Sequence, residues 1–250
     1  MDISGKVAIV TGGAIRIGRA ICESLASEGV AVVVHYGTSA DSAAKTVAKI
    51  NDAGGQAIAV KADLLDGKTS ADKVFSAASN AFGAVDFLIN NASIFESDRL
   101  ADLDEETLER HLAINFKAPL WMSQRFASES FAAEPDDTNQ THVGHIIIIL
   151  DWRALRPEPS FLSYSLAKSA LASATETLAV DLAPNIRVNA IAPGAIVAPA
   201  GDEESHKQRI RETIPLKMSG TPGDIANAVL FLLKSDFITG EILRVSGGER

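Results

Sequence analysis

The sequence predicts an α/β protein built on one seven-stranded parallel sheet with helices on both faces. Short runs rich in valine and isoleucine alternate along the whole chain with longer stretches whose apolar residues recur at the period of a helix. The chain has 250 residues, of which 46% are hydrophobic, and this is enough apolar material for one large core. No linker interrupts the alternation, so we expect a single domain over residues 1–250.

The predicted strands are continuous apolar runs, which suit a parallel sheet buried on both faces. In chain order they are 6–11, 31–36, 56–61, 85–90, 144–150, 186–192 and 241–245. The predicted helices carry an apolar face that can cover the sheet. In chain order they are 16–29, 39–53, 67–81, 103–132, 160–183 and 222–234. The polar run 134–141 is predicted as a surface loop, and 195–220, which has no clear element, as a mobile lid.

The charge of the chain limits its partners. It has 23 lysine and arginine residues against 32 aspartate and glutamate residues, a net charge of -9, which repels nucleic acids and anionic membranes. The chain shows no signal peptide and no apolar run near the roughly 18 residues that span a bilayer. We therefore expect a cytoplasmic protein. The single cysteine, Cys22, is interpreted as a small buried apolar residue without a catalytic role.

A glycine-rich turn over residues 11–18 (TGGAIRIG) joins the first strand to the first helix. Such a turn places backbone N–H groups at a helix N-terminus, where they bind anions, although glycines also serve tight turns and close packing. Residues 35–39 (HYGTS) end the second strand without the acid that usually holds the ribose 2′-hydroxyl of NAD. Since no carboxylate is there to repel a 2′-phosphate, and Thr38 and Ser39 can donate hydroxyls, we expect NADPH as the cofactor.

Tyr164 and Lys168 lie four residues apart in a predicted helix and so share one of its faces. A cation about 4 Å from a phenol can lower its pKa by several units and make the phenol a usable proton donor. A pair with this spacing is common on helices, so its meaning depends on the rest of the chain.

The chain as a whole resembles the short-chain dehydrogenase/reductase family in the order and spacing of its motifs. These are Thr11-Gly12 with Gly18, Asn90-Asn91-Ala92, Asn115, Tyr164 with Lys168, and Pro193-Gly194. The resemblance implies a doubly wound, Rossmann-type sheet, a homotetramer, and catalytic roles for Tyr164 as proton donor or acceptor, Lys168 as ribose ligand and Asn115 in a proton relay. It implies cofactor contacts from Gly12, Arg16, Ile17, Gly18, His35, Tyr36, Thr38, Ser39, Asp63, Leu64, Asn90, Ala92, Ser93, Tyr164, Lys168, Pro193, Gly194 and Ile196. Asp63, which resembles the residue that meets the adenine, can equally cap a helix.

Two departures from the family pattern resemble its pteridine reductase subgroup, which includes dihydromonapterin reductases. Arg16 stands where most members have a third glycine, and Asp151 stands where most have a serine; Ser93 and Phe95 fit the same subgroup. The resemblance implies that Arg16 lies near the phosphates and the pterin, Ser93 contacts both ligands, Phe95 stacks on the pterin, and Asp151 works beside Tyr164.

Asp151 also carries a chemical argument of its own. A ketone reduction develops negative charge on oxygen, which a serine hydroxyl stabilises and an ionised carboxylate repels. A carboxylate instead suits the reduction of a C=N bond, because it can favour a protonated ring nitrogen or accept N–H groups from an aminopyrimidine edge. In a second interpretation Asp151 only caps a turn or pairs with Arg153 or Arg156.

Three functions remain open on the sequence. The first is NADPH-dependent reduction of a pteridine, with a pterin or folate as substrate; the second is a carbonyl or alcohol oxidoreductase of the same fold; the third is a nucleotide sensor without chemistry. The intact Tyr164, Lys168 and Asn115 argue against the sensor. His142 and His145 lack a nearby cysteine or acid at ligand spacing, so we expect no metal site.

Overall fold

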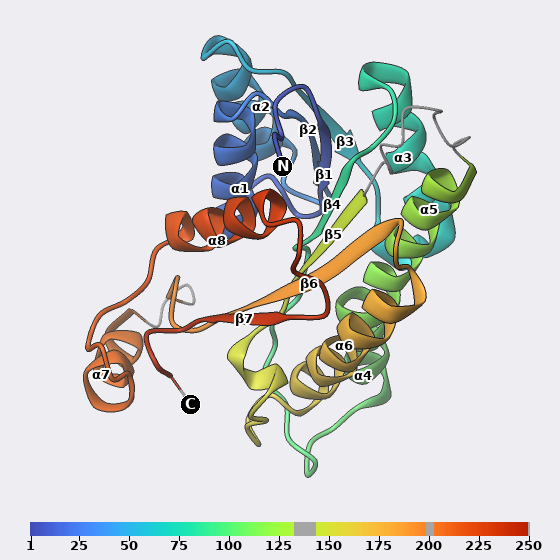
Figure 1. Ribbon diagram of the computed structural model, residues 1–250. Helices are drawn as coiled ribbons and strands as arrows, with labels where there is room; N and C mark the ends of the chain where they lie inside the picture. The colour runs from blue at the N-terminus through green and yellow to red at the C-terminus, as the bar shows by residue number, and fades with distance from the viewer. Residues whose placement is uncertain (133–143, 199–202, 250) are drawn as a thin grey trace.

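The computed structural model describes residues 1–132, 144–198 and 203–249 (Figure 1). Its seven strands form one sheet in the order β3-β2-β1-β4-β5-β6-β7, with every neighbouring pair parallel. This confirms the predicted fold class. The strands are β1 Val7–Val10, β2 Ala31–Tyr36, β3 Ala57–Lys61, β4 Phe87–Asn90, β5 Gly144–Ile149, β6 Ile186–Pro193 and β7 Ile242–Val245.

Helices cover both faces of the sheet. Helices α1, α2 and α8 lie on one face, and α3, α5 and α6 lie on the other with α4 beside them (Figure 1). Two apolar clusters match these two layers, one between the sheet and α1, α2 and α8, the other between the sheet and α3, α5 and α6. The helices are α1 Arg16–Ser27, α2 Ala40–Asp52, α3 Lys68–Phe82, α4 Glu105–Leu112, α5 Ala118–Ala132, α6 Leu162–Asp181, α7 Glu203–Thr213 and α8 Pro222–Lys234.

The strand order reverses direction between β1 and β4, and this reversal positions the site. From β1 the chain moves outward to β2 and β3, then returns to β4 on the other side of β1. The connections after β1 and β4 therefore leave the sheet toward opposite faces and open a crevice at the carboxyl ends of the strands.

Two predicted elements differ from the structure. The helix expected over 103–132 begins later, because Asp104 accepts a hydrogen bond from the backbone N–H of Thr107 (2.8 Å) and caps α4. It also passes through one π-helical turn, η2 (Ala113–Lys117), before α5. The segment 195–220, expected to lack a regular element, contains α7, whose charged sequence carries little apolar periodicity. The predicted loop 134–141 lies outside the described residues.

The structure shows Cys22 as predicted, fully buried beneath the glycine turn with its Sγ 3.6 Å from the carbonyl oxygen of Gly13. Burial raises the pKa of its thiol. None of the helices within the described residues is long and apolar enough to cross a membrane.

Candidate active site

A cleft of about 930 Å³ opens at the carboxyl ends of β1, β2, β4, β5 and β6. Its walls come from the glycine turn, the residues that follow each of these strands, the start of α6 and the segment after β6. The residues predicted for the site line this cleft, with the exception of Asn90 and Asn115. The topology thus brings together groups as distant in the chain as Arg16 and Val197, which are 181 positions apart.

The glycine turn is shaped for close approach of an anion. Gly12 has a φ of +62°, and a Cβ on Gly18 would lie 2.2 Å from the carbonyl oxygen of Gly12, so this position accepts only glycine. Ile15 precedes α1 and has no polar side chain to cap it. The N–H groups of the first turn of α1 are therefore left for a ligand such as a phosphate.

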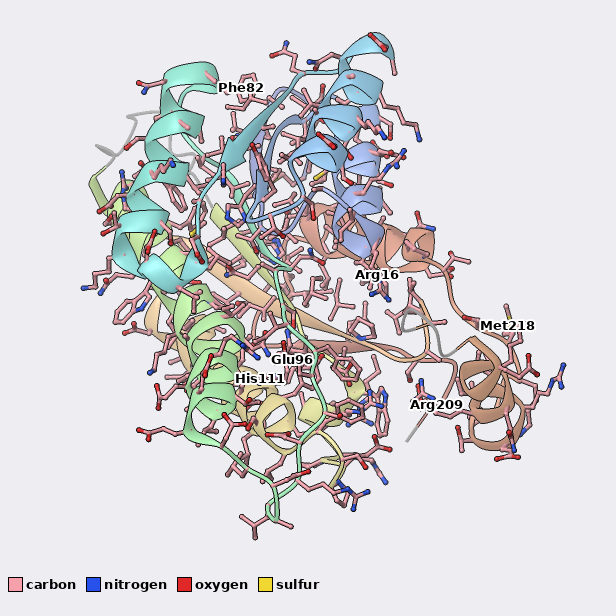
Figure 2. All side chains as sticks on the ribbon, turned by 180° about the vertical axis from the view of Figure 1, so that it is seen from behind. Arg16, Phe82, Glu96, His111, Arg209 and Met218 are labelled. Carbon is pink, nitrogen blue, oxygen red and sulfur yellow. The ribbon has the colours of Figure 1, made fainter. Side chains whose placement is uncertain are left out.

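Arg16 has a φ of 52°, in the left-handed region that glycine adopts without strain. An arginine in this conformation is strained, so it needs a compensating contact. A guanidinium nitrogen of Arg16 donates to the carbonyl oxygens of Val197 and Ala198, each at 3.2 Å. Figure 2 shows Arg16 reaching from the start of α1 toward the segment that follows β6. Arg16 therefore links the two rims of the cleft.

His35, near the end of β2, supports the glycine turn. His35 is buried, its Nδ1 accepts from the N–H of Gly12 (3.2 Å), and its Nε2 lies 3.1 Å from the carbonyl oxygen of Ala62. Burial lowers its pKa, which favours the neutral ring that this pattern requires. Because both ring nitrogens already have hydrogen-bond partners within the protein, His35 affects a ligand only by positioning the glycine turn. Beyond it, a Cβ on Gly37 would meet no atom within 4 Å, so there is open space for a phosphate.

Asp63 follows β3 and lines the cleft, while its Oδ1 accepts from the N–H of Leu65 at 3.0 Å. It thus caps the short 3-10 turn Leu64–Asp66. The contacts therefore show Asp63 as a cap, and its contact with the adenine stays a prediction.

The residues after β4 divide into two sets. The amide of Asn90 turns away from the cleft toward α5, where its Nδ2 lies 3.3 Å from Ser123 Oγ. Its neighbour Asn91 lines the cleft instead, and its Nδ2 donates to the carbonyl oxygens of Thr11 (2.9 Å) and Gly12 (3.2 Å). The motif marked the correct turn, but a one-residue difference along a strand reverses the side-chain direction.

Asn115 lies in the π-helical turn and is fully buried. Its Oδ1 accepts from the N–H of Ile94 and from Ser93 Oγ, both at 2.9 Å, and its Nδ2 donates to the carbonyl oxygen of Ile94 (3.0 Å). Such turns are frequent at functional sites. In this structure Asn115 is therefore a positioning residue that orients Ser93.

Tyr164 and Lys168 lie on α6, as the spacing predicts, and both are buried. Lys168 Nζ donates to the carbonyl oxygen of Ile149 (2.8 Å) and lies 5.9 Å from the centre of the Tyr164 ring. The pKa of Tyr164 is raised well above 10.0, first by burial and then by the charge of Asp151. This direction is opposite to the expected lowering by Lys168, because burial of the phenolate and the charge of Asp151 outweigh the lowering effects, which come from Arg153 and Ser93.

Asp151 combines the two roles that the sequence left open. Its Oδ1 accepts from the N–H of Arg153 (2.8 Å) and from a guanidinium nitrogen of Arg153 (3.3 Å), so it caps the 3-10 turn Trp152–Ala154 and forms an ion pair. Its carboxylate also lines the cleft with Tyr164, and its charge helps to raise the pKa of the phenol. Capping therefore does not remove Asp151 from the chemistry.

The protonation of Lys168 predicts a pH dependence. Burial lowers the pKa of Lys168 from 10.5 to about 8, with Asp151 acting in the opposite direction. Since the cationic form is lost as pH rises through that value, we expect kcat/KM to fall about tenfold per pH unit above it. A pH profile of kcat/KM for the reaction proposed below measures this limb. A flat profile up to about pH 10 would contradict it.

Sequence reasoning missed one ion pair at the cleft. Arg209 of α7 points toward the C-terminal segment (Figure 2) and lies 2.8 Å from an oxygen of the buried Glu249. Glu249 packs against Gly194, where a Cβ would lie 2.7 Å from its Oε2. No local signal marks this pair, because its members are distant in the chain. Ile210 of α7 and Ile214, which directly follows the helix, pack on Ala195 and hold the helix there.

The described residues contain no group of three histidine, cysteine, aspartate or glutamate side chains that could hold a metal ion. His145 is buried, with its Nε2 2.9 Å from Asn189 Nδ2. Burial and the charge of Arg187 lower its pKa well below 6.5. His142 lies outside the described residues.

Comparison with known proteins agrees with this geometry. A family model described as "Enoyl-(Acyl carrier protein) reductase" matches residues 13–249. Dehydrogenase/reductase SDR family member 4 of Homo sapiens is 32% identical over 260 residues, with 98% of this chain and 88% of the relative covered. The chain belongs to the short-chain dehydrogenase/reductase family. This short-chain dehydrogenase/reductase is accordingly an oxidoreductase with a nicotinamide cofactor site.

Two further relatives bear on its specificity. The 3-oxoacyl-[acyl-carrier-protein] reductase FabG of Aquifex aeolicus is 34% identical, with 99% of this chain and 98% of the relative covered. The crystal structure of FolM alternative dihydrofolate reductase 1 from Brucella canis, complexed with NADP, superposes with a TM-score of 0.90 at 34% identity. That superposition covers 99% of this chain and 95% of the FolM chain. The family prediction is therefore confirmed, and the narrower pteridine reductase assignment stays a prediction.

Proposed function

We propose that this short-chain dehydrogenase/reductase reduces a C=N bond of a pteridine, such as a dihydropterin, dihydromonapterin or dihydrofolate, with NADPH. One observation carries the proposal: the Asp151 carboxylate lines the cleft beside the buried Tyr164 phenol, where its charge raises the pKa of that phenol. A carboxylate beside the proton donor suits a ring nitrogen and opposes an alkoxide. The similarity to FolM alternative dihydrofolate reductase 1 supports the same substrate class.

The cofactor part of the proposal rests on the residues around the glycine turn. The turn accommodates a close anion at the start of α1, and no acid ends β2. The FolM structure was obtained with NADP, which supports the same cofactor here. When bound, NADPH supplies the hydride.

The remaining roles belong to residues of this chain. Tyr164 delivers the proton, and the positive charge of Lys168, 5.9 Å from the ring centre, favours the phenolate that this step forms. Asp151 accepts N–H groups of the substrate and orients the phenol. Lys168 binds the ribose, and Asn115 holds Ser93 against Tyr164 and the ligands. Phe95, which is 42% exposed in the cleft and 4.8 Å from the Tyr164 ring, stacks on the flat ring of the substrate.

Turnover measurements test the proposal directly. NADPH oxidation is followed with dihydrobiopterin, dihydromonapterin and dihydrofolate, and with a panel of ketones that includes a 3-oxoacyl thioester. We expect turnover with at least one reduced pteridine. Turnover with ketones alone would replace the proposal with the second candidate, and no turnover with any compound would favour a nucleotide sensor.

The second candidate is a carbonyl reductase. It is favoured by the 34% identity to FabG of Aquifex aeolicus and by Ser93, whose hydroxyl lines the cleft with Tyr164 and can stabilise an alkoxide. Against it stands the charge of Asp151 at the same phenol. The comparison of ketones with pteridines therefore decides between the two candidates.

Replacement of Thr38 by aspartate tests the cofactor choice. Thr38 lines the cleft beside the open space at Gly37. We expect the wild type to bind NADPH more tightly than NADH, and Thr38→Asp to reverse this order because the new carboxylate repels the 2′-phosphate and holds a 2′-hydroxyl. Titration of both nucleotides by protein fluorescence measures the order. A wild type that prefers NADH would overturn the assignment.

We propose that the homotetramer implied by the family resemblance associates through exposed residues of α6. Leu171 and Ala179 of α6 pack inside the subunit core and are not free for a partner. Leu166 and Val180 of the same helix are 51% and 82% exposed. These two residues support association through α6.

A further inference from the structure

One arginine of the cleft, Arg153, lies on the same side as Asp151 and Phe95. Arg153 lines the cleft, yet its side chain is only 10% exposed. The central carbon of its guanidinium lies 4.6 Å from the ring centre of Trp152, 5.0 Å from that of Phe161 and 5.3 Å from that of Phe95. A planar cation on aromatic rings at these distances is held by cation–π attraction and stacking.

Two carboxylates complete the surroundings of this guanidinium. Its Nε donates to an oxygen of Glu158 (2.9 Å), and a terminal nitrogen lies 3.3 Å from Asp151 Oδ1. We call the three rings and two carboxylates the Arg153 cage; it consists of Phe95, Asp151, Trp152, Glu158 and Phe161. The cage selects a flat group with N–H donors along its edge.

The Arg153 cage contains the two residues assigned above to the substrate, Asp151 and Phe95. The 2-amino-4-oxopyrimidine half of a pterin is itself a flat ring with a guanidine-like N–C(NH2)–N edge. Such a ring would stack on Phe95 and donate to Asp151, as the Arg153 guanidinium does now. Since Asp151 Oδ1 already accepts two bonds from Arg153, the side chain and the ring compete for this oxygen.

We propose that the Arg153 cage is the head-group site for a planar ring bearing an amidine or guanidine unit, and that the Arg153 side chain fills it in the free protein and is displaced by the substrate. The inference rests on the proposed function only in placing Asp151 and Phe95 on the substrate side. It names Arg153 as a residue that sets affinity and specificity.

The contacts of Arg153 allow this displacement. The backbone N–H of Arg153 donates to Asp151 Oδ1 at 2.8 Å, and this bond does not depend on the Arg153 side chain. The carboxylate therefore keeps its position when the side chain leaves. The shorter ion pair is with Glu158, whose side chain is 39% exposed, and exposed pairs contribute little to stability. The guanidinium can therefore move outward together with Glu158. Only its 3.3 Å contact with Asp151 is then replaced by a contact between Asp151 and the ligand.

The test measures binding without turnover. Protein saturated with NADP+ is titrated by calorimetry with isocytosine, an uncharged ring that carries the guanidine-like edge and receives no hydride from an oxidised cofactor. We expect Arg153→Met to bind isocytosine about tenfold more tightly than the wild type, because a filled site lowers apparent affinity by the fraction of protein in which it is vacant. Arg156→Met is the matched control, since it removes the same charge from an exposed position in the same loop; we expect it to bind as the wild type does.

Weaker or unchanged binding by Arg153→Met would overturn the inference, because Arg153 would then be part of the site or remote from it. If this variant does not fold, Glu158→Gln decides: it loosens the guanidinium at a half-exposed position, and we expect about threefold tighter binding. Unchanged affinity in Glu158→Gln would then reject the proposal. If the protein reduces no pteridine but these variants bind isocytosine more tightly, the proposed function is wrong and the inference about Arg153 stands. If the protein reduces a pteridine but the variants bind no more tightly, the inference is wrong and the proposed function stands.

Discussion

Asp151→Ser is expected to lower kcat/KM for a reduced pteridine by about 100-fold, the scale of a lost proton-transfer partner. The substitution removes the carboxylate beside Tyr164 and leaves a hydroxyl, which still caps a helical turn well. NADPH affinity should therefore be retained. Ketone reduction should rise, because serine can stabilise an alkoxide where aspartate repels it. Steady-state kinetics with a dihydropterin and with a ketone measure both changes.

Asp104→Ser is the matched control for this variant. Asp104 caps α4 by the same kind of contact, a carboxylate oxygen accepting from a backbone N–H, and it does not line the cleft. We expect wild-type turnover from it. If Asp151→Ser also keeps full pteridine turnover, Asp151 serves only as cap and ion-pair partner, and the assignment is left to Arg16, Ser93 and Phe95.

Tyr164→Phe is expected to reduce turnover of every substrate by about 1,000-fold, because the phenol is the proton donor in both enzyme candidates. The ring is buried and packs edge-on against Phe95 at 4.8 Å, so phenylalanine fills the same space and the fold should persist. Nucleotide binding should change little. Single-turnover measurement of NADPH oxidation, with nucleotide titration beside it, separates a loss of chemistry from a loss of binding.

Residual turnover of Tyr164→Phe within about tenfold of the wild type would contradict its assignment as the acid. The proton would then come from another group at the ring nitrogen. Asp151 is the candidate, since it lines the cleft with Tyr164 and its charge acts on the same phenol. The double variant Tyr164→Phe with Asp151→Ser identifies it, because the remaining turnover should disappear only if Asp151 replaces the phenol.

The cleft owes its position to local patterns that meet at one edge of the sheet. Each strand of a buried parallel sheet is a continuous apolar run, and each is followed by a turn with its own polar residues. The turn at 11–18, the end of β2 and the Asn90-Asn91-Ala92 motif were therefore found in the correct order. The sequence did not show which of the two asparagines faces the cleft, because that depends on how far β4 continues before the chain turns.

The elements that differ from prediction depend on distant contacts. The π-helical turn puts Asn115 opposite Ile94, a residue 21 positions earlier, and no helical period signals such a turn. Helix α7 has a charged sequence, and its one isoleucine, Ile210, packs with Ile214 just beyond the helix and with Ala195. A periodic pattern cannot show either contact, since both partners belong to separate segments.

Residue types and their spacing were sufficient for the fold class, the glycine turn and the placing of Tyr164 and Lys168 on one helix face, because these depend on periodicity and on near neighbours. Only the tertiary structure decided how those groups are charged and what surrounds them. Burial raises the pKa of Tyr164 and lowers that of Lys168 to about 8, and burial is a property of the packed chain. The Arg153 cage likewise joins the segment after β4 to the segment after β5, two stretches that meet only because β4 and β5 are neighbours in the sheet.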